Sequence, residues 1–317
     1  MINLNNIVSF INRSNSFKKI STHNKKIFEN KVINTKNEIL LEFNNFTSNQ
    51  VCLSYFANIL KDKHNANLTA YPGHLLLSIP FKKNLIRKIK FFFGKTFGVK
   101  FFGVYKSFGV NNFFYPELEN RLKKTIDFTY KRFVKNINNL KKLEKFKINN
   151  ILMGDLLYDT FLKNHYHLSP TIDLKTDEFK DFAYDFICLF HIWYNYIKEK
   201  KIKAIVASHA VYTLAIPARI CSKKNIDTYI LTHEYLWRLK KNHPNQYYEV
   251  KNFRKLFKKI KKSSQNKLKK LAKERLSNRL KGNYTSDYGY ITKSPFGKSN
   301  KINIKKNNKN IFVIATH

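Results

Sequence analysis

The stretch KAIVASHAVYTLAIPARICSKKNIDTYILTH, residues 203–233, carries the clearest structural signal of the chain. Two short apolar segments, 203–208 and 227–232, each lead into a histidine, and both are predicted to be strands. Residues 211–223 are predicted to be a helix whose regular part begins close to Pro217, because proline is tolerated only in the first turn of a helix. A strand–helix–strand unit of this kind favours parallel pairing.

His209 and His233 therefore end neighbouring strands, at the edge where open α/β sheets bind their ligands. An imidazole there is suited to proton transfer or to a hydrogen bond with a phosphate or sugar. The alternative for His209 is a half-buried ring that bonds to backbone at the strand end. Tyr212 and Arg219 on the following element favour a site at His209, whereas the aromatic neighbours of His233 fit simple packing equally well.

The rest of the chain predicts the same fold class. Residues 38–43, a helix that begins at Thr47, and residues 67–71 form a second strand–helix–strand unit. We therefore predict an α/β fold in which a Rossmann-like parallel sheet is flanked by helices. The other predicted segments are a loosely ordered lead-in over 1–35, helices near 82–94, 117–137 and 177–200, a strand near 103–107, and a basic helical region over 250–281 interrupted at 262–266.

Residues 150–162 place polar side chains inside an apolar segment. Gly154 allows a backbone turn, and Asp155 is predicted to cap the helix that follows. Asp155 and Asp159, four residues apart, share one helix face beside Tyr158. Two carboxylates in an apolar setting can have their pKa values pushed apart, as acid–base chemistry requires. A cap and a surface hydrogen bond are the plainer interpretation, and both remain open.

Motifs and composition exclude several classes of function. The chain has no G-x-G-x-x-G, P-loop, G-x-S-x-G or H-E-x-x-H motif. Cys52, Cys188 and Cys221 are isolated, so neither a disulfide framework nor a zinc site of the usual spacing is expected. No signal-peptide core begins the chain, and the uncharged run 204–218 is too short to span a bilayer. We expect a cytoplasmic protein, with peripheral contact at the inner face of the membrane as a further option.

The charge of the chain has two interpretations. There are 60 Lys and Arg residues against 21 Asp and Glu residues, a net charge of +39. Such a surface attracts polyanions, whether an anionic membrane face or nucleic acid. However, only nine of the 60 are Arg, the residue preferred for phosphate and base recognition, so A/T-rich coding explains the excess equally and no specific nucleic acid is expected. The region 250–281 is likewise either a polyanion- or membrane-binding element or the solvated face of a packed helix.

Several of these motifs together resemble a group of bacterial capsule and surface-polysaccharide biosynthesis proteins, which are related in fold to GT-B glycosyltransferases. The segments that carry the resemblance are 151–162, 170–173, 208–212, 216–220 and 279–282. The block Gly-Asp-x-x-Tyr-Asp within the first of them is the most specific part. The resemblance implies transfer of a sugar from a nucleotide-sugar to a glycan or lipid-linked acceptor, with no metal and no cofactor besides that donor.

The resemblance also implies roles for single residues. Asp155 or His209 would be the general base. The residues that would bind the acceptor or support the cleft are Tyr158, Asp159, Tyr212, Arg219 and His233. The alternative function is that of a non-catalytic basic protein that binds a polyanion.

The same resemblance predicts how the chain is organised. The predicted parts are a lead-in (1–35), an acceptor-side Rossmann-like domain (36–250), a basic helix and linker (251–310), and the first strand of a truncated C-terminal domain (311–317). A chain that stops at His317 would lack the second half of a GT-B enzyme, and would be incomplete or inactive alone.

Overall fold

The computed structural model describes residues 15–28, 34–44, 47–72, 85–99, 101–165, 172–231, 235–243 and 253–280. The chain divides into two compact units, Met1–Tyr248 and Glu249–His317. The predicted linker after 281, the predicted strand at 311–316 and His317 lie outside the described residues.

The first unit is built on a six-stranded sheet with the strand order β3-β2-β1-β6-β7-β8. The first five strands are parallel to their neighbours, and β8 pairs antiparallel with β7. The α/β, Rossmann-like fold class predicted from the sequence is confirmed. The strands are β1 (Asn37–Phe43), β2 (Asn67–Pro72), β3 (Val110–Phe113), β6 (Lys201–Ala207), β7 (Asp227–Leu231) and β8 (Leu236–Leu239).

Both faces of the central strands are buried, because alternate side chains point to opposite faces. In β6, Ala204 and Val206 belong to one hydrophobic cluster, whereas Ile205 belongs to the other. In β1, Ile39 and Leu40 divide in the same way. A near-continuous apolar strand is therefore the expected sequence for this position, as residues 203–208 show.

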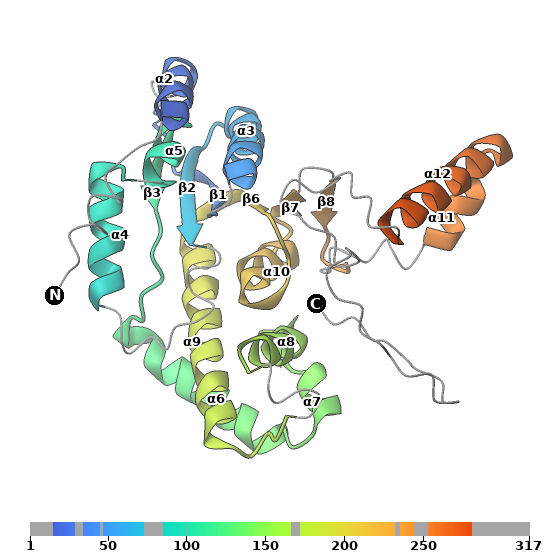
Figure 1. Ribbon diagram of the computed structural model, residues 1–317. Coiled ribbons are helices and arrows are strands. Elements are labelled where there is room, and N and C mark those ends of the chain that lie inside the picture. Colours follow the sequence, from blue (N-terminus) through green and yellow to red (C-terminus); the bar gives the residue numbers. More distant parts are fainter. Residues whose placement is uncertain are drawn as a thin grey trace, which may run out of the picture. The chain divides into compact units, whose positions relative to one another are not determined.

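Helices cover the two faces of the sheet (Figure 1). One face packs against α3 (Thr47–His64) and α5 (Phe101–Ser107), and the other against α9 (Asp177–Glu199) and α10 (Ala215–Lys223). Pro217 lies in the first turn of α10, which follows the short 3-10 helix η4 (Tyr212–Leu214), so it interrupts no helical hydrogen bond. The other described helices of this unit are α2 (Asn15–Phe28), α4 (Leu85–Phe97), η2 (Asn120–Leu122), α6 (Lys123–Asn136), α7 (Leu140–Glu144) and α8 (Gly154–Asn164).

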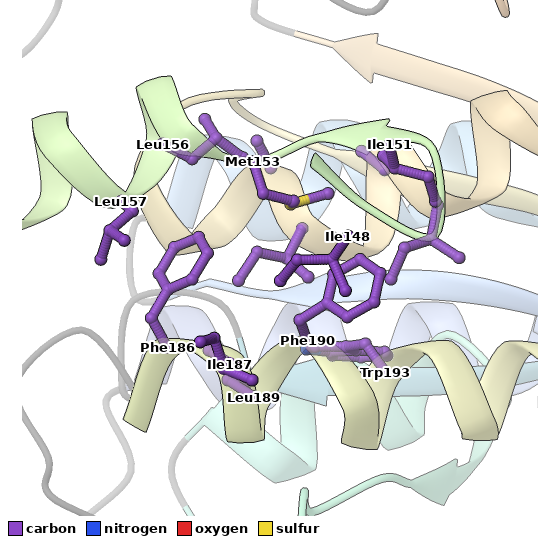
Figure 2. Close-up of a cluster of buried hydrophobic side chains, with 14 of the residues drawn as sticks. Ile148, Ile151, Met153, Leu156, Leu157, Phe186, Ile187, Leu189, Phe190 and Trp193 are labelled. Atoms are coloured by element: carbon purple, nitrogen blue, oxygen red, sulfur yellow. The ribbon is translucent and has the colours of Figure 1, made fainter. Parts of the chain in front are cut away.

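Helix α9, the longest among the described residues, begins and ends as its sequence predicts. Thr176 is the N-cap, and its hydroxyl accepts a hydrogen bond from the Phe179 backbone N–H at 3.3 Å. Acidic residues lie in the first turn and Lys198 in the last, which suits the helix dipole. Its apolar stripe packs against α8 and the small hairpin of β4 (Lys147–Ile148) and β5 (Ile151–Leu152), as Figure 2 shows for Phe186, Phe190, Ile151 and Leu156.

The strand predicted near 103–107 is wrong, because these residues form α5 and the strand follows as β3. Phe102 and Tyr105, three residues apart, both face the core, which is helical rather than strand-like spacing. Gly109, with a φ of 78°, makes the turn between the two elements.

The lead-in also differs from the expectation of loose order. Residues 15–28 form α2, in which Ser21 and Asn24 are buried. The Asn24 amide donates to the Ser107 hydroxyl at 3.3 Å, and Phe28 packs against Tyr55 and Phe108. Contacts with α3 and α5 thus order a polar sequence that has little tendency to fold alone.

The described part of the second unit consists of α11 (Phe253–Lys259) and α12 (Lys262–Leu280). The break between them falls at residues 260 and 261, before the predicted interruption at 262–266, which instead forms the first turn of α12. None of the described side chains of these two helices is buried. Among all the described residues, no helix is both long and apolar enough to cross a bilayer.

Candidate active site

The candidate site lies at the carboxyl ends of β1 and β6. The chain proceeds from β1 through β2 to β3 on one side of the sheet, and from β6 through β7 to β8 on the other. The strand order therefore reverses between β1 and β6, and open α/β sheets bind ligands in the crevice outside such a reversal. Residues 42–44 and 208–209 are the ones that the two strands deliver to this point.

Glu42, at the end of β1, is a buried carboxylate with an exposed fraction of 1 %. It accepts a hydrogen bond of 2.6 Å from the Ser208 backbone N–H and further bonds of 2.9 Å from the Ser208 hydroxyl and the Asn44 amide. These donors are neutral, so the carboxylate is satisfied by hydrogen bonds from uncharged groups. A buried acid held in this way at a ligand-binding edge is a strong candidate for a functional group.

His209 continues this network outward. Its Nδ1 lies 2.9 Å from the Ser208 Oγ, and the ring is half-buried. The single hydroxyl proton of Ser208 points to the Glu42 carboxylate, both oxygens of which lie 2.9 Å from the Ser208 Oγ. The Ser208 oxygen must then accept from Nδ1–H of His209, which places the lone pair of the neutral ring on Nε2. Glu42, Ser208 and His209 thus form a carboxylate–hydroxyl–imidazole chain.

Hydrogen bonds from α3 and α5 hold the backbone of residues 42–44, which carries the Glu42 carboxylate. The Tyr105 hydroxyl donates to the Glu42 carbonyl and accepts from the Asn44 N–H, both at 2.8 Å. Gln50, on α3, donates its amide to the Asn44 carbonyl at 2.8 Å. Burial raises the pKa of Tyr105 well above its ordinary value, so its hydroxyl keeps the proton that it donates. Side chains from α5 and α3 thereby hold the backbone of Glu42 and Asn44 in place.

Asp155 and Arg219 form a two-pronged ion pair that joins α8 to α10. Both guanidinium nitrogens lie 2.6 Å from the two carboxylate oxygens, and the Arg219 side chain is only 4 % exposed. Arg219 also donates to the Leu152 carbonyl at 2.9 Å. The expected helix cap is wrong, since Met153 occupies the N-cap position and Asp155 lies in the first turn of α8. Its carboxylate bonds to Arg219, and no side chain caps the start of α8.

Asp159 and Tyr158 lie on the next turn of α8. Partial desolvation raises the pKa of Asp159, repulsion from Asp155 adds to this effect, and Arg219 opposes it. The two carboxylates therefore act on each other across one helix face. Tyr158 is partly buried and packs against the larger hydrophobic cluster.

Tyr212 is the first residue of η4, which follows His209. Its φ is 54°, a left-handed conformation that is strained for a bulky residue and is found mostly where function requires it. The Lys163 ammonium, from α8, lies 4.3 Å from the centre of the Tyr212 ring. The loop after β6 is thus tied to α8, and η4 contacts α8 directly.

Glu42, Asn44 and Tyr105 were not among the predicted site residues. Glu42 was visible only as one acid in an otherwise apolar stretch, Ile-Leu-Leu-Glu-Phe, at the end of a predicted strand. That pattern is a usable signal, because a buried strand seldom carries an unpaired acid without a reason. His233, a predicted acceptor-binding residue, and the first two residues of the segment 170–173 lie outside the described residues.

No group of three or more His, Cys, Asp or Glu side chains that could hold a metal ion occurs among the residues that the structure describes. The chain was also compared with protein-family models, with curated proteins and with solved structures, and no match was found in any of the three.

Proposed function

We propose that the protein is a glycosyltransferase-like enzyme that transfers a sugar from a nucleotide-sugar to a hydroxyl of a glycan or lipid-linked acceptor. The observation that carries the proposal is the Glu42–Ser208–His209 chain at the reversal of the strand order. Sugar transfer needs a base beside the acceptor hydroxyl, and a histidine whose tautomer is set by a buried acid meets that need. The resemblance of several motifs to capsule and surface-polysaccharide biosynthesis proteins supports this reaction class.

In the proposed reaction, His209 Nε2 accepts the proton of the acceptor hydroxyl while that oxygen bonds to the anomeric carbon of the donor. The bond from the anomeric carbon to the phosphate oxygen breaks, and the nucleotide leaves with the bonding electrons. The imidazolium keeps its Nδ1–H bond to Ser208, and the negative charge of Glu42 behind the hydroxyl stabilises it.

The geometry favours His209 over Asp155 as the base, because both carboxylate oxygens of Asp155 are engaged by Arg219. We assign Asp155 and Arg219 to positioning, since they hold α8 against α10. Tyr158, Asp159 and Tyr212 are the proposed acceptor-binding residues, because they lie on α8 and on η4, which follows His209.

The test is release of nucleotide from a panel of nucleotide-sugars in the presence of glycan and lipid-linked acceptors. We expect His209→Ala to lower kcat by about 10²–10⁴-fold, the usual contribution of a general base. Glu42→Gln should lower kcat by about tenfold and shift the acidic limb of the pH–rate profile to lower pH, because the imidazolium loses a stabilising charge. His23→Ala, at an exposed histidine of α2, is the matched control and should leave kcat unchanged.

A folded His209→Ala variant with normal kcat would rule out His209 as the base. A second result would favour the polyanion-binding alternative instead. In that case no donor would be turned over. The protein would also bind generic DNA in a salt-dependent way, and charge reversal in α11 and α12 would abolish this binding.

A further inference from the structure

Helix α4 exposes an apolar face. The exposed fractions are 57 % for Ile89, 68 % for Phe92, 44 % for Phe93 and 62 % for Phe97. Residues at spacings of three, four and eight lie on one side of an α-helix, so these four side chains form a single ridge along α4. Figure 1 shows α4 beside α5 at the β3 edge of the sheet.

The opposite face of α4 holds the helix in place. Phe91 packs against Phe102 and Tyr115, with ring centres 5.2 Å and 4.9 Å apart. Gly94 is buried against the Phe102 ring, so closely that a side chain at residue 94 would collide with it. The helix is therefore anchored by its inner face, and the outward apolar ridge is additional to the residues that the fold needs.

The charges around the ridge are positive. Helix α4 contains one Arg and three Lys residues and no acidic residue. Lys88 and Lys90 are both exposed and lie on either side of Ile89 around the helix. Lys88 pairs with Glu117 at 3.0 Å, an exposed pair that contributes little and leaves the net charge of the rim positive.

These features select one occupant for the ridge. A second copy would set one lysine rim against another in a chain that already carries a charge of +39. An anionic bilayer matches both features, since phenylalanine side chains enter the interface and flanking lysines contact the headgroups. We propose that α4 docks the protein on the surface of an anionic lipid bilayer, with Phe92 and Phe97 inserted and Lys88 and Lys90 at the headgroups.

Helix α12 provides a contrast. It is strongly basic and also exposes leucines, at Leu268, Leu271 and Leu276, but it contains no aromatic residue. The apolar face of α4 carries three exposed phenylalanines, which are better suited to insertion at a membrane interface than the leucines of α12. This inference is independent of the proposed sugar transfer, because no residue of α4 belongs to the candidate active site.

The experiment is co-sedimentation of the whole chain with vesicles of phosphatidylcholine alone or with about one third phosphatidylglycerol. We expect binding only to the anionic vesicles. The double variant Phe92→Ser/Phe97→Ser should bind about tenfold or more weakly at unchanged thermal stability, and Lys88→Gln/Lys90→Gln several-fold more weakly. Phe128→Ser, at a residue of α6 that is 63 % exposed, is the matched control and should bind like the parent protein.

Three results would overturn the proposal. One is a Phe92→Ser/Phe97→Ser variant that binds anionic vesicles as the parent does. Another is loss of binding on charge reversal at Lys267, Lys269 and Lys270 of α12 with α4 intact. The third is a parent protein that sediments as a dimer and becomes monomeric in the α4 variant, which would make the ridge a contact between copies. Nucleotide release measured with a soluble acceptor should be unaffected by the α4 substitutions, so the two proposals can fail separately.

Discussion

Ser208 has one hydroxyl proton, and both a carboxylate and an imidazole lie within 2.9 Å of its oxygen. The hydroxyl donates a hydrogen bond to the Glu42 carboxylate, so the orientation of a single O–H bond decides which nitrogen of His209 is basic. Sequence reasoning found the Ser–His pair but not its partner, since Glu42 comes from a strand more than 160 positions away in the chain. The partner of Arg219 was also out of reach, because Asp155 was predicted to cap a helix.

Gly154 is a second residue whose role only the structure explains. It lies in the first turn of α8, where a Cβ would overlap the Leu143 carbonyl oxygen. On an unobstructed helix, Gly→Ala stabilises by up to about 1 kcal/mol. We expect Gly154→Ala to lower the free energy of unfolding by about 2–4 kcal/mol instead, because the backbone of α7 must move away.

Urea denaturation followed by circular dichroism measures this effect. Lys141→Ala, at an exposed position of α7, is the control and should change stability by less than about 0.5 kcal/mol. A Gly154→Ala variant more stable than the parent would show that α7 does not approach α8 this closely.

At the scale of elements, α6 and α9 are joined by a hydrogen bond between Thr129 and the Nε2 of His191, at 2.9 Å. Burial lowers the pKa of His191 from its ordinary value of 6.5 to about 4. Between pH 6.5 and about pH 4, His191 therefore binds a proton in the unfolded chain but not in the folded protein. The stability contributed by neutral His191 is complete above pH 6.5 and is lost progressively as the pH falls toward 4.

We expect about 3 kcal/mol of unfolding free energy to be lost over that range through His191 alone, since each pKa unit corresponds to about 1.4 kcal/mol. His191→Gln keeps a donor for Thr129 but does not titrate. The difference in unfolding free energy between parent and variant should thus shrink or change sign from pH 7 to pH 4.5. A difference that is constant across this range would contradict the assignment.

The elements predicted well are those whose pattern is local. The apolar stripe and the capping residues of α9 lie within one segment, and the predicted helix matches α9 closely. The strand predicted at 103–107 failed because the segment is short and aromatic, and its helical form depends on Tyr105 reaching the backbone of β1. Helix α2 was not predicted for the same reason, since its order comes from contacts with α3 and α5.

At the scale of the whole molecule, the parallel, Rossmann-like class of the sheet was predictable, but the order of its strands was not. Each strand–helix–strand unit implied parallel neighbours, yet nothing local to either unit showed that β1 would lie beside β6. The location of the candidate site follows from that one pairing, because it creates the reversal of strand order. The sequence thus predicted His209 as part of the site, whereas Glu42 could be found only from the assembled sheet.

The net charge of +39 is also a property of the whole molecule, and like charges repel one another more in the compact state than in the unfolded chain. Salt screens this repulsion. We expect Tm to rise by several degrees as NaCl increases from about 20 mM to about 300 mM, as measured by scanning fluorimetry. An uncharged osmolyte at equal osmolarity is the control, and an unchanged or lower Tm in salt would contradict this expectation.

The pairing of β1 with β6 has a consequence for the order in which the protein forms. Residues 44–200 lie between these two strands, so the centre of the sheet cannot close until most of the first unit has left the ribosome. Until then, the edge of β1 that later pairs with β6 is without a partner, and its apolar residues lack half of their cover. Long-range parallel pairing of this kind is slow, because a large loop must close before any contact compensates for its lost entropy. The same pairing that creates the site thus leaves an apolar strand edge uncovered while the nascent chain is synthesised.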